Sequence, residues 1–304
     1  MTEQNIIPHD YHTAVLLSES IEALQINPEG VYVDVTMGAA GHSRAILDKL
    51  STGRLFAFDQ DKDAWKNAPE DARFTLIKEN FADAKNWLSI HGVKKVDGLL
   101  ADLGVSSHQF DTAERGFSIR MDGPLDMRMN HQSSLTAHQV VNEYNAENLT
   151  RLFRLYGEVE KPHVAARQII ASRPISSTHQ LIKALIGDED WKNHHQFLAK
   201  VFQSIRIEVN KEMEVLESLL VQLPELIEVN GRVVIISYHS LEDRMVKSFF
   251  RSGNLEDKMQ KDFFGNILRP FHPLNAKPIL PRSEELSQNT RSRSAKLRIA
   301  QRNA

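Results

Sequence analysis

The segment VYVDVTMGAAGHS, residues 31–43, has the residue types of a ligand-binding turn. An apolar run ends at Asp34, and a turn containing Gly38 and Gly41 then leads into a helix-length segment. In open α/β sheets, ligands bind beyond the carboxyl ends of the strands, where small residues let backbone N–H groups come close. Alanines at positions 39 and 40 break the G-x-G-x-x-G spacing of a dinucleotide site, so a dehydrogenase is disfavoured. A tight strand–helix turn without a ligand is the alternative interpretation.

Two further carboxylates follow apolar runs. Asp59 is placed to accept hydrogen bonds from both hydroxyls of a ribose, and Asp102 follows the run Leu-Leu-Ala. One Asp in such a position is an ordinary turn former. Three of them, counting Asp34, are better explained by one shared site. Phe81 follows the next run, where its ring either packs on an adenine or belongs to the core.

Five short runs rich in β-branched and aromatic residues are predicted to be strands. They span 31–36, 54–58, 73–77, 96–101 and 232–236. The runs are continuous rather than alternating, which is typical of strands covered on both faces. Helix-length segments at 43–50, 61–67 and 81–91 separate the first four. This order predicts an α/β fold with a doubly wound, mostly parallel sheet.

The fifth run begins about 130 residues after the fourth, far more than a crossover helix needs. Residues 107–210 contain helically spaced apolar positions and no good strand run. We therefore expect an inserted all-helical domain at 107–210, within a domain formed by 1–106 and 211–304. Residues 209–226 are predicted to form one long amphipathic helix that leads into the fifth strand.

The composition limits the classes of protein. The chain has 304 residues, of which 41% are hydrophobic and 25% charged, which excludes a disordered or fibrous chain. It has no cysteine, so disulfides, thiolate metal sites and a cysteine nucleophile are excluded. No apolar run approaches the ~20 residues of a membrane-spanning helix, and the first ten residues lack the features of a secretory signal. We expect a cytoplasmic protein without a membrane partner.

The net charge of −3 is unevenly distributed. Residues 251–304 contain 11 Lys and Arg against 5 Asp and Glu, a local charge of +6, so the first 250 residues carry −9. A basic segment on an acidic body indicates a polyanionic partner, and a solvated tail explains the composition equally well. The same segment contains RSAKLRIA, in which Leu297 and Ile299 lie on one face of a predicted strand.

Eight strings in the chain together resemble one family. They are HTAVLLSES, DVTMGAAGHS, ADLGVSSHQFD, ERGFS, DGPLDMRM, FQSIRIEVNKE, SYHSLEDR and RSRSAKLRIAQR. In this order, from about His12 to Arg302, they are similar to the bacterial methyltransferases that modify N4 of a cytosine in small-subunit ribosomal RNA. DGPLDMRM and SYHSLEDR are long and unusual, so the resemblance is highly specific.

The resemblance implies S-adenosyl-L-methionine as methyl donor, bound by a Rossmann-like domain, with the helical insert recognising RNA. Carried over by position, the cofactor-binding residues are Ala40, Gly41, His42, Asp59, Phe81, Asp102 and Gln109. The first turn departs from the G-x-G-G-H of the family, because Ala40 adds a methyl that narrows the approach to the methionine end. The stretch YGEVEKPHVAA also departs from a more basic version in the family.

Cytosine N4 is a poor nucleophile because its lone pair is conjugated with the ring. A carboxylate that accepts an N4 hydrogen pushes electron density onto the nitrogen, and Asp102 is the candidate catalytic residue. Binding the cofactor is the competing role of Asp102, and both roles can hold. His42 is expected either to bind the cofactor carboxylate or to cap the following helix. His239 either touches the target base or belongs to a turn with Ser240 as helix N-cap and Asp243 at N3.

The target base must reach the cofactor from a single strand or by extrusion from a stem. The candidates for holding the RNA phosphates are Arg115, Arg120, Arg128, Arg291 and Arg293. Asp122, Asp126 and Arg128 are expected either to form a loop held by internal ion pairs or to contact substrate. His194 and His195 lack the spacing of a metal site, so no metal is assigned.

Three classes of function remain open. An RNA methyltransferase acting on ribosomal RNA within the small ribosomal subunit is the first. A small-molecule or protein methyltransferase is the second, and the helical insert and basic C-terminal segment disfavour it. A noncatalytic ribosomal RNA binder is the third, against which the glycine turn and Asp59 argue. Monomer and homodimer are both compatible with the sequence.

Overall fold

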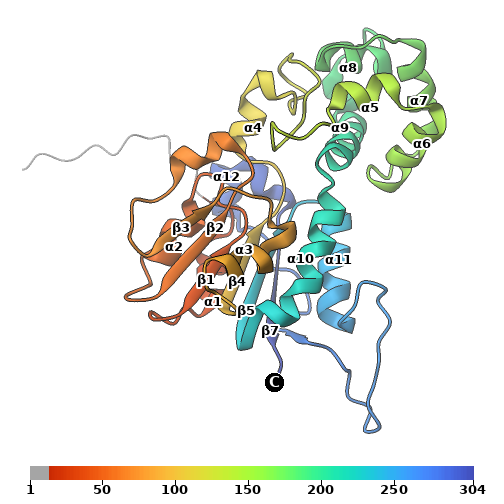
Figure 1. Ribbon diagram of the computed structural model, residues 1–304. Helices are drawn as coiled ribbons and strands as arrows, with labels where there is room; N and C mark the ends of the chain where they lie inside the picture. Colours follow the sequence, from red (N-terminus) through yellow and green to blue (C-terminus); the bar gives the residue numbers. More distant parts are fainter. Residues whose placement is uncertain (1–13) are drawn as a thin grey trace, which may run out of the picture. The chain divides into compact units, whose positions relative to one another are not determined.

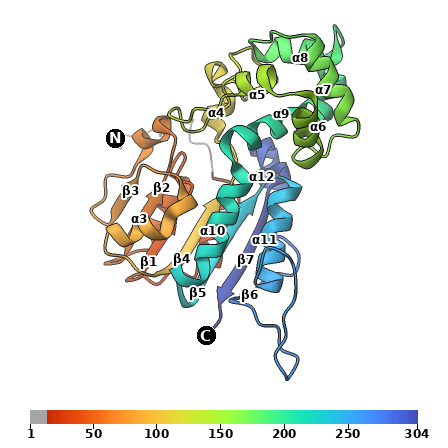
Figure 2. The same ribbon diagram turned by 45° about the vertical axis from the view of Figure 1, so that its right-hand side comes forward.

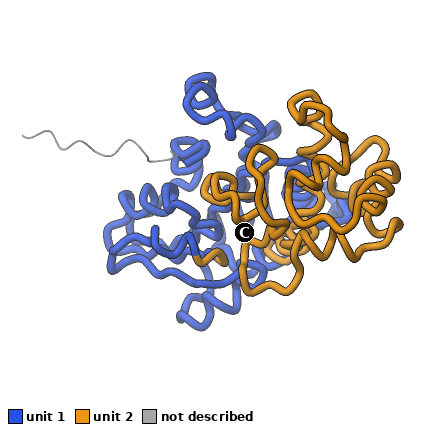
Figure 3. Tube along the Cα trace, turned by 90° about the horizontal axis from the view of Figure 1, so that it is seen from above, with its two compact units in different colours: residues 1–59, 63–103, 220–304 blue, residues 60–62, 104–219 orange. Residues whose placement is uncertain are grey.

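The computed structural model describes residues 14–304, which divide into two compact units. Unit 1 comprises the described residues up to 59 together with 63–103 and 220–304, and unit 2 comprises 60–62 and 104–219 (Figure 3). The predicted insert at 107–210 corresponds to the central part of unit 2. The start of the first family string, at His12, and the ten residues inspected for a secretory signal lie outside the described residues.

A seven-stranded sheet forms the centre of unit 1 (Figure 1). Its strands are β1 (Val31–Asp34), β2 (Arg54–Phe58), β3 (Phe74–Ile77), β4 (Val96–Asp102), β5 (Ile227–Ser237), β6 (Phe271–Pro273) and β7 (Lys296–Arg302). The order is β3-β2-β1-β4-β5-β7-β6, with β1 to β5 parallel and β7 antiparallel to both neighbours. This confirms the predicted α/β class and the five predicted strands.

Helices cover both faces of the sheet, which explains the continuous apolar runs in its central strands. The helices of unit 1 are α1 (Leu17–Leu24), α2 (Gly41–Leu47), α3 (Ala84–Ile90), α11 (Ser240–Ser252) and α12 (Ser283–Gln288), with the second half of α10 (Glu212–Leu226). Leu24 of α1 and Leu47 of α2 pack with Leu100 and Val234 in one core cluster. Figure 2 shows α3, α10 and α11 in front of the sheet. Leu99 and Leu100 of β4 are consequently fully buried.

Two local predictions differ from the structure, and one short strand was not predicted. Residues 62–67 form a 3-10 helix, η1 (Lys62–Asn67), rather than an α-helix. The segment expected as one helix from 209 to 226 contains a break at Lys211, whose φ of 51° ends α9 (His195–Asn210) before α10 begins. The strand β6 was not predicted, because three residues are too short to show an alternation.

The regular elements of unit 2 are helices. They are α4 (Ser107–Asp111), α5 (Ala137–Glu143), α6 (Ala146–Leu155), α7 (Pro162–Ala171), α8 (Thr178–Ile186) and α9, with short 3-10 turns and the first half of α10. Four of the six begin at polar N-caps whose side chains accept a backbone N–H, namely Ser106, Thr136, Asn145 and Ser177. Leu149, Phe153 and Leu198 are fully buried in a core separate from that of unit 1.

Candidate cofactor and catalytic site

Asp34, at the end of β1, organises the turn that follows it. Its side chain is fully buried, and Oδ2 accepts a 2.6 Å hydrogen bond from the Ser43 hydroxyl while Oδ1 accepts the backbone N–H of Thr36 at 3.1 Å. Burial raises the pKa of this carboxyl, and the nearby His42 and the hydroxyl of Ser43 oppose the rise. Both carboxylate oxygens accept hydrogen bonds from residues of the turn, so Asp34 stabilises the conformation of the turn.

Thr36 connects the ends of β1 and β4. Its hydroxyl oxygen accepts the backbone N–H of Asp102 at 2.6 Å, and the backbone N–H of Val35 donates to the carbonyl of Leu100 at 2.9 Å. Two of the three carboxylates predicted to share a site, Asp34 and Asp102, are therefore linked through one threonine. Because β1 and β4 are parallel, their carboxyl ends bring Asp34 and Asp102 to the same edge of the sheet.

Asp59, at the end of β2, is tied to the glycine turn. Its Oδ2 accepts the backbone N–H of Gly38 at 2.8 Å, and its backbone carbonyl accepts the indole N–H of Trp65 at 2.9 Å. Gly38 has a φ of +52°, a conformation that favours glycine, and its carbonyl accepts the side-chain amide of Asn67 at 3.0 Å. The carboxylate thus lies at the turn, partly exposed, where the resemblance places the ribose.

The residues at 40 and 41 are confined for different reasons. Ala40 has a φ of 62° and is fully buried, packing with Met37 and Ala57. A Cβ at Gly41 would lie 2.9 Å from Cβ of Ala14, so this glycine allows a close approach of the preceding chain. The methyl of Ala40 is therefore directed into the protein.

His42 is the second residue of α2 and is buried. Its Nε2 lies 3.1 Å from the carbonyl of Val15, and its Nδ1 lies 3.9 Å from Oδ2 of Asp102. The expectation that His42 caps the helix is wrong, because Ala40 occupies the N-cap position. The imidazole instead lies between the N-terminal segment and the carboxylate at the end of β4.

Asp102 is held by a residue that the sequence analysis did not single out. The hydroxyl of Tyr238, directly after β5, donates a 2.7 Å hydrogen bond to Oδ1 of Asp102. The side chain of Asp102 is 21% exposed. Burial raises the pKa of Asp102 to about 6, against the lowering effects of His42 and of the Tyr238 hydrogen bond. Burial and the neighbouring carboxylate also raise the pKa of the Tyr238 phenol, which therefore remains a donor.

The start of α11 fixes Tyr238. The N-cap is His239, whose Nδ1 accepts the backbone N–H of Glu242 at 3.4 Å. Oε2 of Glu242 in turn accepts the backbone N–H groups of Tyr238, at 2.9 Å, and His239, at 3.3 Å. The predicted N-cap, Ser240, and the predicted N3 residue, Asp243, are each wrong by one position. The N-cap is His239 and the N3 residue is Glu242. The string SYHSLEDR contained the signal for Tyr238, since an aromatic residue directly after a buried strand lies at the strand's end.

Phe81 and Gln109 occupy different surroundings. Phe81 begins the 3-10 turn η2 (Phe81–Asp83) and is partly buried. Gln109 belongs to unit 2 and is 3% exposed. Its Oε1 accepts the backbone N–H of Ser106 at 3.0 Å, and its Nε2 donates to Asp61 at 2.5 Å. The amide of Gln109 therefore caps α4 and binds a buried carboxylate.

Asp61 also accepts Nη1 of Arg115 at 2.8 Å, and both side chains are nearly fully buried. The other Nη of Arg115 donates to the carbonyl of Arg128 at 2.8 Å. Arg115 was considered for phosphate binding, and its burial within unit 2 makes that role wrong. A buried guanidinium with a paired carboxylate stabilises the local structure instead.

The loop containing Arg128 is held by an ion pair with Asp126, which is one of the two alternatives stated for it, whereas Asp122 accepts the backbone N–H of His179 at 3.0 Å. Two nitrogens of Arg128 contact both carboxylate oxygens of Asp126, at 2.9 and 2.7 Å, and the third donates to the carbonyls of His131 and Ser133. Burial acts to raise the pKa of Asp126, and the hydrogen bonds and charge of Arg128 together outweigh it, so the pKa is lowered. All three nitrogens of the Arg128 guanidinium donate hydrogen bonds within the loop.

The basic C-terminal segment divides into two parts. Arg298 of β7 is buried, and its Nε donates to Asp243 at 2.6 Å, while Lys296 lies 3.6 Å from the same carboxylate. Arg291 and Arg293 precede the strand and are exposed. The solvated part of the segment is therefore shorter than its composition suggested. Arg120, in unit 2, is also exposed.

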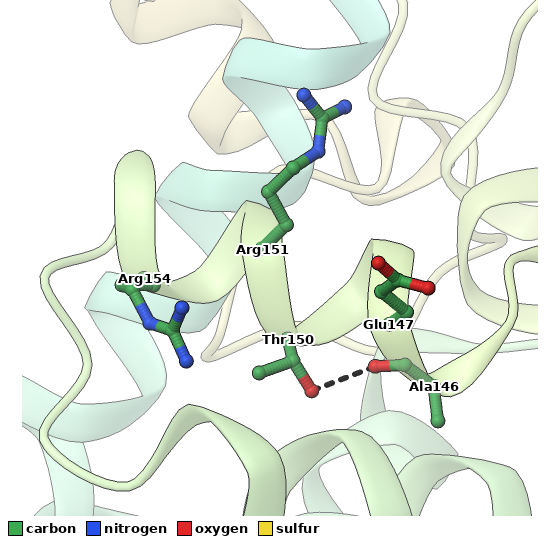
Figure 4. A pocket seen from close by; sticks show the side chains of 5 residues that line it. All are labelled: Ala146, Glu147, Thr150, Arg151 and Arg154. Carbon is green, nitrogen blue, oxygen red and sulfur yellow. Dashed lines mark hydrogen bonds between the residues drawn. The ribbon is translucent and has the colours of Figure 1, made fainter.

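A shallow pocket on α6 of unit 2 was not predicted. It is lined by Ala146, Glu147, Thr150, Arg151 and Arg154 (Figure 4). The Thr150 hydroxyl donates to the Ala146 carbonyl at 2.6 Å, and both arginines are exposed. The two arginines are three residues apart, and their side chains extend from the helix in different directions (Figure 4).

The sheet order, the small-residue turn after β1 and the carboxylate at the end of β2 define an S-adenosylmethionine-dependent methyltransferase with a Rossmann-like fold. The family model described as MraW methylase family matches residues 9–303. The chain therefore belongs to the MraW methylase family, which confirms the resemblance, the enzyme class and the cofactor expected from the sequence.

Curated relatives match over almost their whole length. A protein of Amoebophilus asiaticus named ribosomal RNA small subunit methyltransferase H is 52% identical over 299 residues, which cover 97% of this chain and 96% of the relative. A protein of the same name from Flavobacterium psychrophilum is 52% identical, and the match covers 94% of this chain and 100% of the relative. Another from Bacteroides thetaiotaomicron is 50% identical, and the match covers 96% of this chain and 97% of the relative. Among the helices of residues 14–304, none is both long and apolar enough to cross a membrane.

Proposed function

We propose that this protein transfers a methyl group from S-adenosylmethionine to the exocyclic N4 of a cytidine in small-subunit ribosomal RNA. The observation that carries the proposal is Asp102, a partly exposed carboxylate at the end of β4 that Tyr238 holds in one orientation. The names of the curated relatives support ribosomal RNA of the small subunit as the substrate. The two-unit organisation supports a substrate larger than the cofactor.

The residues of unit 1 suit a nucleoside-type cofactor. In the turn of residues 38–41, Gly38 has a left-handed conformation, and the nearest atom to a Cβ built there is the Thr36 carbonyl oxygen at 4.0 Å, so its backbone is open to a close approach by a ligand. Gly41 instead leaves room for Ala14. Asp59 would hold the ribose and Phe81 the adenine, and Gln109 is proposed as a further contact from the sequence position. When bound, the sulfonium supplies an electrophilic methyl group to an in-line nucleophile.

Asp102 acts on the nucleophile. As an ionised carboxylate it accepts a hydrogen bond from the N4 amine, which reduces conjugation of the nitrogen lone pair with the ring and draws the amine toward tetrahedral geometry. The same carboxylate can take up the proton that N4 loses as it gains the methyl group, and then release that proton to solvent. With a pKa of about 6, this carboxyl is predominantly ionised at neutral pH. The Tyr238 hydroxyl fixes its orientation by occupying Oδ1, and the rest of the contribution is positioning.

Exposed arginines are proposed to hold the RNA phosphates. Arg120, Arg291 and Arg293 remain candidates because they are exposed, and the pocket on α6 adds Arg151 and Arg154. Arg128 is proposed to contribute by shaping its loop, since Asp126 and two carbonyls take up its donors. Each arginine that neutralises a phosphate releases counterions, so RNA affinity should decrease with salt.

The test is incubation of the purified protein and radiolabelled cofactor with small ribosomal subunits and with protein-free rRNA, both from cells that lack the modification. Label should enter one cytidine of the rRNA and release N4-methylcytidine on digestion, and the Asp102→Asn variant should be slow. Label recovered in ribosomal protein or a small molecule would support the second class of methyltransferase. Cofactor binding without transfer to any substrate would indicate a noncatalytic binder.

A further inference from the structure

A hairpin that projects from unit 1 is not accounted for by the site. Residues 254–270, here called the 254–270 hairpin, connect α11 to β6 and extend away from the sheet (Figure 1). Its two sides are joined by hydrogen bonds from the backbone N–H of Leu268 to the carbonyl of Gln260, at 2.8 Å, and from Asp262 to Asn266, at 2.9 Å. The hairpin therefore has a defined backbone.

Asp262 builds the tip. Its Oδ1 accepts the backbone N–H groups of Phe264 and Asn266, at 2.8 and 2.9 Å, and its Oδ2 accepts the side-chain amide of Asn266 at 2.9 Å. These hydrogen bonds lower the pKa of Asp262. Gly265 completes the turn with a φ of +88°. These contacts define the backbone conformation of the turn.

Phe263 and Phe264 lie at the tip of the turn. Phe263 is 98% exposed and Phe264 is 85% exposed, and their rings are 5.7 Å apart at an interplanar angle of 87°. Because the rings are perpendicular and in solvent, they offer ring faces in two directions. A pair of large apolar side chains exposed on an ordered turn marks a contact surface rather than a folding requirement.

One exposed basic side chain lies next to the rings, in a C-terminal segment that is basic as a whole. Two of the three acidic groups of the hairpin form ion pairs, Asp257 with Arg251 and Glu256 with Lys258 at 2.5 Å, and Asp262 keeps its negative charge within the turn. Lys261, directly before the turn, is exposed and makes no ion pair with the described residues. Lys261 is therefore the basic group available to a phosphate next to the rings, in a segment, residues 251–304, whose net charge is +6.

The hairpin leaves the sheet near the amino ends of the parallel strands, whereas Asp102 lies at their carboxyl ends. The helix α11 starts directly after the carboxyl end of β5 and runs back along the sheet for 13 residues, which is about 20 Å. The strand β6 then pairs with the last residues of β7, where Phe271 lies opposite Arg302. Substitutions at the tip should therefore leave the cofactor site unchanged.

We propose that the tip of the 254–270 hairpin binds unpaired nucleobases of the RNA substrate by stacking on Phe263 and Phe264. Aromatic side chains next to a basic group bind single-stranded RNA with little dependence on base identity, because every base has a π face. Lys261 lies where it can contact the adjoining phosphate. This second contact, remote from the methylated base, rests on the proposed function for the identity of the substrate.

The test compares Phe263→Ser/Phe264→Ser with Met259→Ser, a control that removes an apolar side chain from the same hairpin, where Met259 is 50% exposed. Binding is measured to protein-free small-subunit rRNA and to assembled subunits. Loss of stacking should weaken rRNA binding by about 5-fold or more in the double variant. The control should bind as the parent does. Cofactor affinity and thermal unfolding should be unchanged in both, since the rings are exposed.

A second variant gives a direct signal. In Phe263→Trp the indole should preserve rRNA affinity. Its fluorescence is measured as the difference between the variant and the parent. Single-stranded oligonucleotides should quench this fluorescence more than duplexes of equal charge do. This measurement detects stacking even if the double serine variant folds poorly.

Three outcomes would overturn the proposal. Unchanged rRNA affinity of the double serine variant, with no quenching of the new tryptophan, removes the hairpin from the RNA. Weaker binding to assembled subunits alone assigns it to a ribosomal protein, and a parent that self-associates while the variant does not assigns it to a second copy of the chain. If the parent binds and methylates no RNA, the proposed function fails first. If the parent methylates rRNA, only the hairpin proposal is at stake.

Discussion

The hydroxyl of Tyr238 donates to Oδ1 of Asp102 at 2.7 Å, so residues from the ends of β5 and β4, 136 positions apart in the chain, form one unit. Burial raises the pKa of Asp102 to about 6, and this hydrogen bond opposes the rise because it favours the ionised form. Tyr238 is therefore a positioning residue, which fixes the orientation of the carboxylate and keeps it ionised at neutral pH.

Removal of the Tyr238 hydroxyl should shift the pH profile of methyl transfer upward. In the parent, the single-turnover rate should rise with pH through about 6, as Asp102 ionises. In Tyr238→Phe the midpoint should move to higher pH by about one unit, because a hydrogen bond to the charged form is lost. The matched control is Tyr32→Phe, which removes a hydroxyl that contacts the backbone N–H of Asn27 instead. An unchanged midpoint in Tyr238→Phe would assign the tyrosine a purely structural role.

Asp102→Asn should separate catalysis from cofactor binding. If the carboxylate polarises the N4 amine, the isosteric amide should lower the single-turnover rate more than it lowers cofactor affinity. Asp97→Asn is a suitable control on the same strand, since Asp97 accepts the backbone N–H of Val31 at 2.8 Å. Equal losses of rate and affinity would restrict Asp102 to cofactor binding.

The same carboxyl should affect stability. Its pKa is raised from 3.8 to about 6 in the folded state, so the folded protein binds more protons than the unfolded chain in that window. The contribution of Asp102 to the free energy of unfolding should therefore fall as pH rises from about 4 to about 6. This slope should be absent in Asp102→Asn, as measured by chemical denaturation.

Asp59→Ala should weaken cofactor binding by about 1–3 kcal/mol, because ribose hydroxyls would lose their acceptor in a partly buried site. The alanine also leaves the backbone N–H of Gly38 without its acceptor, which loosens the glycine turn. Asp59→Asn separates the two effects, since an amide oxygen can still accept that N–H. Titration calorimetry and thermal unfolding measure them, and normal affinity in both variants would remove Asp59 from the site.

The sheet and the three strand-end carboxylates were predictable because they depend on local patterns. Continuous apolar runs indicate buried parallel strands, and the direction of parallel strands brings Asp34, Asp59 and Asp102 to one edge. The partner of Asp102 was not predictable in the same way. Tyr238 reaches it through pairing of β4 with β5 across the insert, and no local pattern encodes that pairing.

The arginines show why composition misleads about charged surfaces. Arg115 and Arg298 contribute to local positive charge in the sequence, and the structure buries both against carboxylates distant in the chain, Asp61 and Asp243. Burial of a charge depends on partners brought together by tertiary structure. Periodicity placed Leu297 and Ile299 in a strand correctly, and it could not show that Arg298 between them has a buried partner.

Ala40→Gly should stabilise the protein. Ala40 has a φ of 62°, where a side chain costs about 1 kcal/mol that glycine avoids, and the small methyl lost from the interior offsets part of the gain. Ala39→Gly is the control, because Ala39 is exposed and has no positive φ, so it should be neutral or destabilising. Chemical denaturation of both variants measures the two signs, and a less stable Ala40→Gly would show that packing of the methyl with Met37 and Ala57 outweighs the backbone strain.

The exposed part of the basic segment should contribute to RNA affinity and not to cofactor affinity. Arg291 and Arg293 precede β7, and replacing both with Gln leaves the strand and the Arg298–Asp243 pair intact. Each phosphate contact in a single strand contributes about −0.7 to the slope of log affinity against log salt, so the double variant should have a slope smaller in magnitude by about 1 to 1.5. Lys277→Gln removes an exposed charge from the same region and serves as the control. An unchanged affinity and slope for Arg291→Gln/Arg293→Gln would confine the phosphate contacts to other arginines, of which Arg120, Arg151 and Arg154 of unit 2 are then the candidates to substitute next.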